Sequence, residues 1–176
     1  MLRMPDPGFL KQMLASLPGP DKPIRIALVG IGHELRGDDA AGIAIARALE
    51  PLAASHDRLL VIDAGSVPES FVGVLRRFEP DLVVLLDAAR LGADPGTIRW
   101  IAWQEITGIS AFTHSLPLNI FVEYLINELD CEVAILGIQP GQTTFGEPLS
   151  PVIQESVGKA VDMLTNLLLT SDAAEI

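Results

Sequence analysis

Cysteine is almost absent from this sequence, because Cys131 is the only one among 176 residues. A single thiol cannot form an intramolecular disulfide, so a reducing compartment is expected. A zinc ribbon and an iron–sulfur cluster are excluded as well, since each requires several cysteine ligands. Cys131 itself is interpreted as a small buried hydrophobic residue.

Basic residues are also scarce. The chain has 12 lysines and arginines against 23 aspartates and glutamates, which gives a formal net charge of −11. Such an acidic surface repels phosphate backbones and anionic lipid headgroups. No nucleic-acid partner is therefore expected. A basic protein or peptide partner remains compatible with this charge.

The sequence has no apolar run long enough to cross a bilayer, so membrane insertion is not expected. The apolar residues near the N-terminus are interrupted by Lys11 and Gln12, and this pattern is not that of a signal peptide. We therefore expect a cytoplasmic protein, and we expect a monomer.

The length and the 49% content of hydrophobic residues predict one domain with a real core. We place that domain at residues 23–170, after an N-terminal extension at 1–22 and before a frayed tail at 171–176. Within the extension, Phe9, Leu10, Met13, Leu14 and Leu17 have helical spacing, which favours a short amphipathic helix.

Apolar runs of strand length alternate with amphipathic helical segments along the domain. The expected strands are 24–31, 58–63, 81–87, 97–102 (an edge strand) and 132–138, and the expected helices are 39–53, 70–78, 116–129 and 150–168. This alternation predicts an α/β fold with three layers, in which a twisted, mostly parallel five-stranded sheet has helices on both faces.

Three polar residues follow strands or precede helices in this arrangement: Asp39, Asp87 and His114. Ligands of open α/β sheets bind beyond the carboxyl ends of the strands, so loops there can bring the three together. Two carboxylates and an imidazole form a ligand set that suits zinc, nickel, manganese or iron and leaves coordination positions open. Each residue also has an ordinary structural explanation. Asp39 could be an N-cap or first-turn acid of its helix, Asp87 could cap a loop, and His114 could be a hydrogen-bonded loop histidine.

Several familiar catalytic and binding motifs are missing. Gly30 and Gly32 follow a strand as in a dinucleotide-binding loop, but the third glycine of that fingerprint would fall at Leu35. The serine-hydrolase pattern G-x-S-x-G and the zinc-protease pattern H-E-x-x-H do not occur.

An ordered set of short motifs nevertheless resembles one known family. These motifs are Gly30-Ile31-Gly32-His33 with Gly37-Asp38-Asp39-Ala40-Ala41-Gly42, Asp63-Ala64-Gly65-Ser66-Val67-Pro68-Glu69, Asp87-Ala88, Thr113-His114-Ser115-Leu116-Pro117-Leu118-Asn119 and Gly137-Ile138-Gln139-Pro140. In this order and spacing they resemble the hydrogenase maturation endopeptidases, and they are most similar to the branch that serves formate-hydrogenlyase-type hydrogenases. The resemblance extends from Ile24 to Leu168.

The resemblance implies an enzyme that removes the C-terminal extension of a nickel-loaded large-subunit precursor of a nickel–iron hydrogenase. It implies cleavage after a basic residue just beyond the last metal-binding cysteine motif. Asp39, Asp87 and His114 become the catalytic and metal-contacting residues, and the metal becomes a divalent ion, nickel presented by the substrate, with no organic cofactor. Gly32, His33, Asp38, Asp63 and Gly65 become supporting residues.

Two positions depart from the family pattern. His33 stands where the family usually has asparagine, so it adds a ligand or alters the hydrogen bonds of its loop. Ala64 replaces a common glycine. Whether the carboxylates hold their own metal, contact substrate nickel or act as acid and base on water stays open.

Two other functions remain as alternatives. A nucleotide-binding module would use the loop from Gly30 to Gly42, and it would show affinity for nucleotides. A non-catalytic metal-binding chaperone for hydrogenase assembly would use Asp39, Asp87 and His114 but would leave the precursor uncut.

Overall fold

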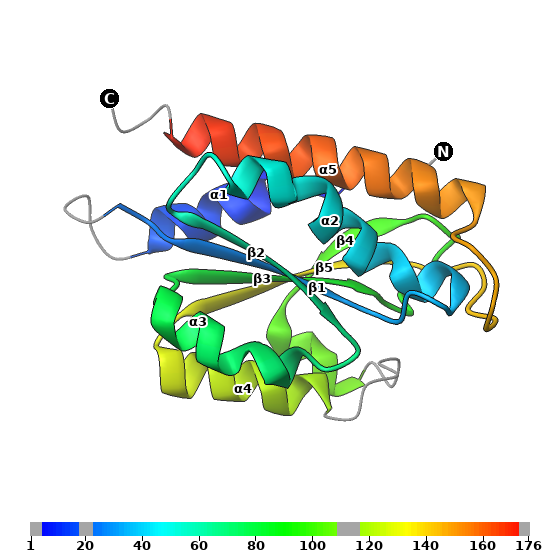
Figure 1. The fold of residues 1–176 in the computed structure, drawn as a ribbon, viewed down its shortest axis with the longest axis horizontal. Coiled ribbons are helices and arrows are strands. Elements are labelled where there is room, and N and C mark those ends of the chain that lie inside the picture. Colours follow the sequence, from blue (N-terminus) through cyan, green and yellow to red (C-terminus); the bar gives the residue numbers. More distant parts are fainter. Residues whose placement is uncertain (1–4, 18–22, 109–116, 173–176) are drawn as a thin grey trace.

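The computed structural model describes residues 5–17, 23–108 and 117–172, and its sheet lies between two layers of helices (Figure 1). The strands are β1 (Ile26–Ile31), β2 (Leu59–Gly65), β3 (Leu82–Ala88), β4 (Ile98–Ile101) and β5 (Glu132–Ile138). The α-helices are α1 (Pro7–Ser16), α2 (Ala41–Ala53), α3 (Val72–Phe78), α4 (Leu118–Leu129) and α5 (Pro151–Asp172). Short 3₁₀ turns are η1 (Gly37–Ala40), η2 (Pro68–Phe71) and η3 (Trp103–Gly108).

The strand order in the five-stranded sheet is β2-β1-β3-β5-β4. The first four strands in this order are parallel, and β4 pairs antiparallel with β5 at the edge. The predicted α/β class, the mostly parallel sheet and the edge strand are therefore confirmed. Nearly continuous burial along β1 and β3 explains why both read as unbroken apolar runs.

Side chains of alternate strand residues form two cores, one on each face of the sheet. On one face Leu28 of β1 packs with Ile45 of α2 and Leu164 of α5. On the other face Val29 of β1 packs with Leu75 of α3 and Phe121 of α4. Figure 1 shows α1, α2 and α5 on the first face and α3 and α4 on the second. This two-sided cover is what the alternating sequence pattern predicts.

The N-terminal extension forms the expected helix and packs against the first core. Leu10 of α1 is fully buried in that core. The Phe9 ring stacks on Trp100 of β4, with 5.6 Å between ring centroids. Helix α1 therefore covers part of the face that α2 and α5 leave open.

Two boundaries differ from the expected ones at the edge that matters for function. The helix expected from Asp39 begins at Ala41, and Asp39 lies in η1 just before it. The strand expected to end at Asp63 continues to Gly65, after an irregularity in its register with β1. In both places the chain is held by polar contacts between loops, which a periodic apolar pattern does not reveal. None of the helices in the described segments is long and apolar enough to cross a membrane.

Candidate active site

The strand order places a switch point between β1 and β3, where open α/β folds have their ligand-binding crevice. In the strand order, β1 has β2 as one neighbour and β3 as the other. The chain leaves β1 through α2 and reaches β2, so it moves away from β3. At such a switch point the connections diverge to opposite faces, and the carboxyl ends of the two strands border an open site. Asp39 follows β1, and Asp87 lies near the end of β3.

Close backbone packing places Asp39 at this crevice. A Cβ added to Gly32 would lie 1.9 Å from the Asp39 carbonyl oxygen, so only glycine allows η1 to approach the end of β1. A Cβ added to Gly42 would lie 2.0 Å from the Leu86 carbonyl oxygen, so the start of α2 rests on β3 next to Asp87. These two contacts bring the residues that carry Asp39 and Asp87 to the same edge of the sheet.

Both carboxylates are buried. The exposed fraction is 6% for Asp39 and 1% for Asp87. The Oδ1 atom of Asp87 accepts a hydrogen bond of 2.8 Å from the Ala88 amide. Asp87 interrupts a strand whose other residues are all apolar and buried. Burying a charged carboxylate is costly without compensating polar partners, so two such residues at a switch point favour a functional role over simple packing.

The third predicted residue, His114, lies outside the described residues, and its placement stays a prediction. It precedes α4 in the sequence, and that helix starts at Leu118. Within the described segments 5–17, 23–108 and 117–172, no group of three or more His, Cys, Asp or Glu residues could hold a metal ion. Asp39 and Asp87 therefore supply the described oxygen donors of the candidate site.

Asp38, predicted only as a supporting residue, joins two distant segments. Its fully buried carboxylate accepts hydrogen bonds from the amides of Gly141 and Gln142 at 2.8 Å through Oδ2. Through Oδ1 it accepts a bond of 2.7 Å from the Ser150 amide. Asp38 thus fastens both ends of the loop 141–150 to η1, directly beside Asp39. We call this set of three bonds the Asp38 latch.

His33 takes part in loop contacts, one of the two roles expected for it. Its Nδ1 atom accepts a hydrogen bond of 3.2 Å from the Leu35 amide. Its ring meets Phe145 edge to face, with 6.2 Å between ring centroids. The Gly146 amide donates to the Leu35 carbonyl oxygen at 2.7 Å. The loop after β1 and the loop after β5 therefore form one connected surface.

Asp63 and Gly65 brace the end of β2 against the same loop. The Arg47 guanidinium donates to Asp63 and to Glu34, each at 2.7 Å, and these bonds raise the pKa of Arg47, with Glu34 contributing most. Gly65 has a φ of +56°, and its carbonyl oxygen accepts from the Gly32 amide at 3.0 Å. Their observed contacts are structural, and they hold the β1 loop in place.

Two hollows flank this edge. One has a volume of about 270 Å³ and is lined by Gly32, His33, Glu34, Ile43, Arg47, Asp63, Gly65 and Ser66. The other has about 420 Å³ and is lined by Arg90, Gly92, Ala93, Gln139, Pro140, Gly141, Gln142 and Thr143. Gln139 lines the second hollow, and its Oε1 atom accepts a hydrogen bond from the Leu91 amide at 2.6 Å.

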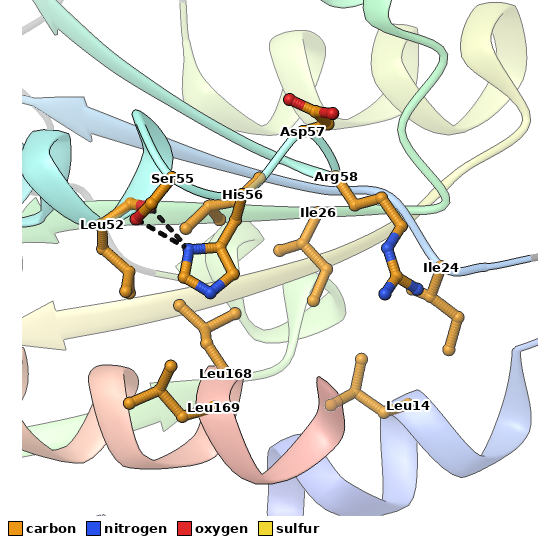
Figure 2. A pocket seen from close by; sticks show the side chains of 11 residues that line it. Leu14, Ile24, Ile26, Leu52, Ser55, His56, Asp57, Arg58, Leu168 and Leu169 are labelled. Atoms are coloured by element: carbon orange, nitrogen blue, oxygen red, sulfur yellow. Dashed lines mark hydrogen bonds between the residues drawn. The ribbon is translucent and has the colours of Figure 1, made fainter. Parts of the chain in front are cut away.

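A third hollow, of about 310 Å³, lies at the opposite edge of the sheet, where the strands begin. Figure 2 shows Leu14, Ile26, His56 and Leu168 around it. His56 is engaged there through its Nδ1 atom, which lies 2.8 Å from the Leu52 carbonyl oxygen. Because Asp39 and Asp87 are at the other edge, this hollow is not the candidate active site.

The geometry at the carboxyl edge favours metal-linked or hydrolytic chemistry over nucleotide binding. In a dinucleotide-binding loop the space beside the glycines receives phosphate, but beside Gly32 it is filled by the Asp39 backbone. Two buried carboxylates would also repel a phosphate group. Carboxylate oxygens instead suit a divalent ion or an attacking water.

Comparisons with known proteins identify a family of proteases. Residues 43–167 match the family model described as hydrogenase maturation protease, a range that includes Asp87 and His114 and begins just after Asp39. A putative hydrogenase maturation protease of Methanocaldococcus jannaschii is 35% identical over 150 residues, which are 82% of this chain and 88% of that protein. The hydrogenase 3 maturation protease of Escherichia coli K12 is 34% identical over 131 residues, 74% of this chain and 82% of that protein.

A solved structure extends the similarity to the fold. The crystal structure of the [NiFe] hydrogenase maturation protease HycI from Thermococcus kodakarensis superposes with a TM-score of 0.79 at 31% identity. That superposition covers 91% of this chain and 98% of the other. On these matches in sequence and fold, the chain belongs to the hydrogenase maturation protease family.

Proposed function

We propose that this protein is an endopeptidase that removes the C-terminal extension from the large-subunit precursor of a nickel–iron hydrogenase after nickel has been inserted. The observation that carries the proposal is the pair of buried carboxylates, Asp39 and Asp87, at the switch point of the sheet. Membership of the maturation protease family supplies the class of reaction.

The carboxylates have two tasks in this proposal. Together with His114 they contact the nickel that the precursor carries, and this contact places the scissile peptide bond at the crevice. A carboxylate beside that bond takes a proton from the attacking water, the ordinary role of a general base. Two carboxylates and one histidine leave coordination positions of the nickel for the precursor's own ligands.

The proposal also explains selectivity. An enzyme whose site is completed by the substrate's metal acts on one class of folded, nickel-bearing protein and is not a general protease. A metal-binding assembly chaperone would contact the same nickel and leave the precursor at full length, so cleavage itself separates the two functions.

The test is to incubate the purified protein with a nickel-loaded precursor and to measure the mass of the large subunit. Wild type should shorten it, and Asp39→Asn and Asp87→Asn should each slow the reaction by about 100-fold or more. Asp57→Asn is the matched control, since the exposed Asp57 lies at the opposite edge (Figure 2). Circular dichroism verifies that every variant is folded. An uncut precursor with wild type, or full activity in both site variants, would refute the proposal.

A further inference from the structure

Exposed large apolar side chains gather at the edge that carries the candidate site. Among the described residues, five large hydrophobic side chains are exposed: Leu35, Val67, Ile120, Phe145 and Leu169. Leu35, Val67 and Phe145 lie in turns that follow β1, β2 and β5, at the carboxyl edge. Single exposed apolar residues are common on proteins, but a group beside a crevice indicates a surface that binds something.

Leu35 and Phe145 lie in two loops that are joined through Gly146, the residue after Phe145, and we call this pair the apolar rim. The Gly146 amide donates to the Leu35 carbonyl oxygen at 2.7 Å, and His33 lies against the Phe145 ring. The exposed fraction is 51% for Leu35 and 68% for Phe145. About half of Leu35 and two thirds of Phe145 are therefore in contact with water, while a backbone hydrogen bond joins their two loops.

The rim is held in position by the residue next to the site carboxylate. The Asp38 latch fastens both ends of the loop 141–150, which carries Phe145. Asp38 and Asp39 are adjacent in η1. The position of Phe145 is thus coupled to that of Asp39 through a few covalent and hydrogen bonds. A binding surface ordered before its partner arrives loses less conformational entropy on binding.

The rim is linked to both hollows of this edge through neighbouring residues. His33, in contact with Phe145, lines the first hollow, and Gln142, at the start of the same loop, lines the second. A polypeptide bound along this edge could therefore contact the rim as well as the hollows. Exposed aromatic and aliphatic side chains at such a place are typical anchors of protein interfaces.

We propose that Leu35 and Phe145 form a docking surface for the precursor chain that flanks the scissile bond, and that this surface contributes to substrate recognition independently of nickel. This inference rests on the proposed function, because the occupant is the polypeptide that the site cleaves. The rim binds apolar side chains of that segment, while the carboxylates contact its metal. The net charge of −11 of the enzyme favours a basic segment nearby.

The test is steady-state cleavage of nickel-loaded precursor by wild type, Phe145→Ala, Leu35→Ala and the double variant. Each single change should raise KM several-fold, and the double change should raise it roughly tenfold or more, with kcat within about twofold of wild type. Phe145→Leu keeps an apolar side chain and should recover most of the affinity. Leu169→Ala removes a side chain that is 44% exposed at the opposite edge, and it should leave both constants unchanged.

Two outcomes overturn the inference and leave the proposed function intact. In the first, wild type cleaves the precursor and the double variant has the wild-type KM. In the second, KM is unchanged and sedimentation shows that wild type forms a dimer that Phe145→Ala abolishes, so that a second copy of the chain occupies the rim. Failure of wild type to cleave the precursor contradicts the proposed function itself.

Discussion

Asp38 and Asp39 are neighbours with different surroundings. The Asp38 carboxylate accepts hydrogen bonds from three backbone amides, and their residues are more than 100 positions away in the sequence. Asp39 is buried at the carboxyl edge of the sheet, with its backbone against Gly32. The acidic pair that the family resemblance singles out thus contains one residue that holds the structure together and one that belongs to the candidate site.

Replacing Asp38 should destabilise the fold. Asp38→Ala leaves three buried amides without their charged acceptor and should lower the free energy of unfolding by about 3–5 kcal/mol. Asp38→Asn keeps nearly the same side-chain shape. However, the NH₂ group of asparagine would replace one of the two acceptor oxygens and would face amide donors, so this variant should also be less stable. Urea unfolding measures both effects. Asp57→Ala, an exposed control, should change stability by less than about 0.5 kcal/mol. Wild-type stability in both Asp38 variants would contradict the latch.

Cys131 gives a prediction of pH dependence. Burial raises the pKa of its thiol from 9.0 to about 11. The unfolded chain therefore loses the thiol proton at a lower pH than the folded chain, and stability falls as the pH rises from about 9 to about 11. The loss from this group should reach about 2–3 kcal/mol.

The variant Cys131→Ala isolates this effect from other groups that titrate at high pH. Relative to it, wild type should lose stability between pH 8 and pH 11 in urea unfolding experiments. A difference between the two proteins that does not change with pH would show that the thiol contributes nothing to the pH dependence.

At the scale of the elements, glycine contacts set how closely α2 approaches the sheet. Gly42→Ala would place a methyl group against the carbonyl oxygens of Leu86 and Ile31, which cannot move without disturbing β3 and β1. The substitution should cost at least about 2 kcal/mol and should displace η1, which carries Asp39. Calorimetry measures the stability, and the cleavage assay measures the effect on the site.

Gly158 in α5 is the matched control. A Cβ added there meets nothing within 4 Å. Gly158→Ala should therefore stabilise the protein by about 0.5–1 kcal/mol, because alanine has the higher helix propensity. If both substitutions had the same effect, close packing of α2 would not be what requires glycine at position 42.

Local sequence patterns predict the strands, whereas contacts between distant loops could not be predicted from the sequence. The strands were predictable because burial on both faces produces unbroken apolar runs, as in β3, and Asp87 was noticeable because it ends such a run. The position of Asp39 ahead of α2, within η1, was not predictable. It depends on bonds between Asp38 and the loop 141–150, and such long-range contacts leave no periodic signal. The apolar rim was missed for the same reason, since Leu35 and Phe145 are distant in sequence and meet only through loop contacts.

At the scale of the whole molecule, the two edges of the sheet differ in character. The edge where strands begin has an apolar hollow covered by α1 and α5 (Figure 2). The edge where strands end has buried carboxylates, two hollows and the apolar rim. Open α/β folds place their sites at this second edge, and the acidic chain as a whole favours a partner with basic residues.

We propose that the substrate supplies the metal that the carboxylates recognise. The most direct measurement compares the mass of the large subunit after incubation of wild type with nickel-loaded and with nickel-free precursor. The account predicts that the nickel-loaded precursor is shortened and that the nickel-free precursor keeps its full length under the same conditions. Equal shortening of both precursors would contradict it.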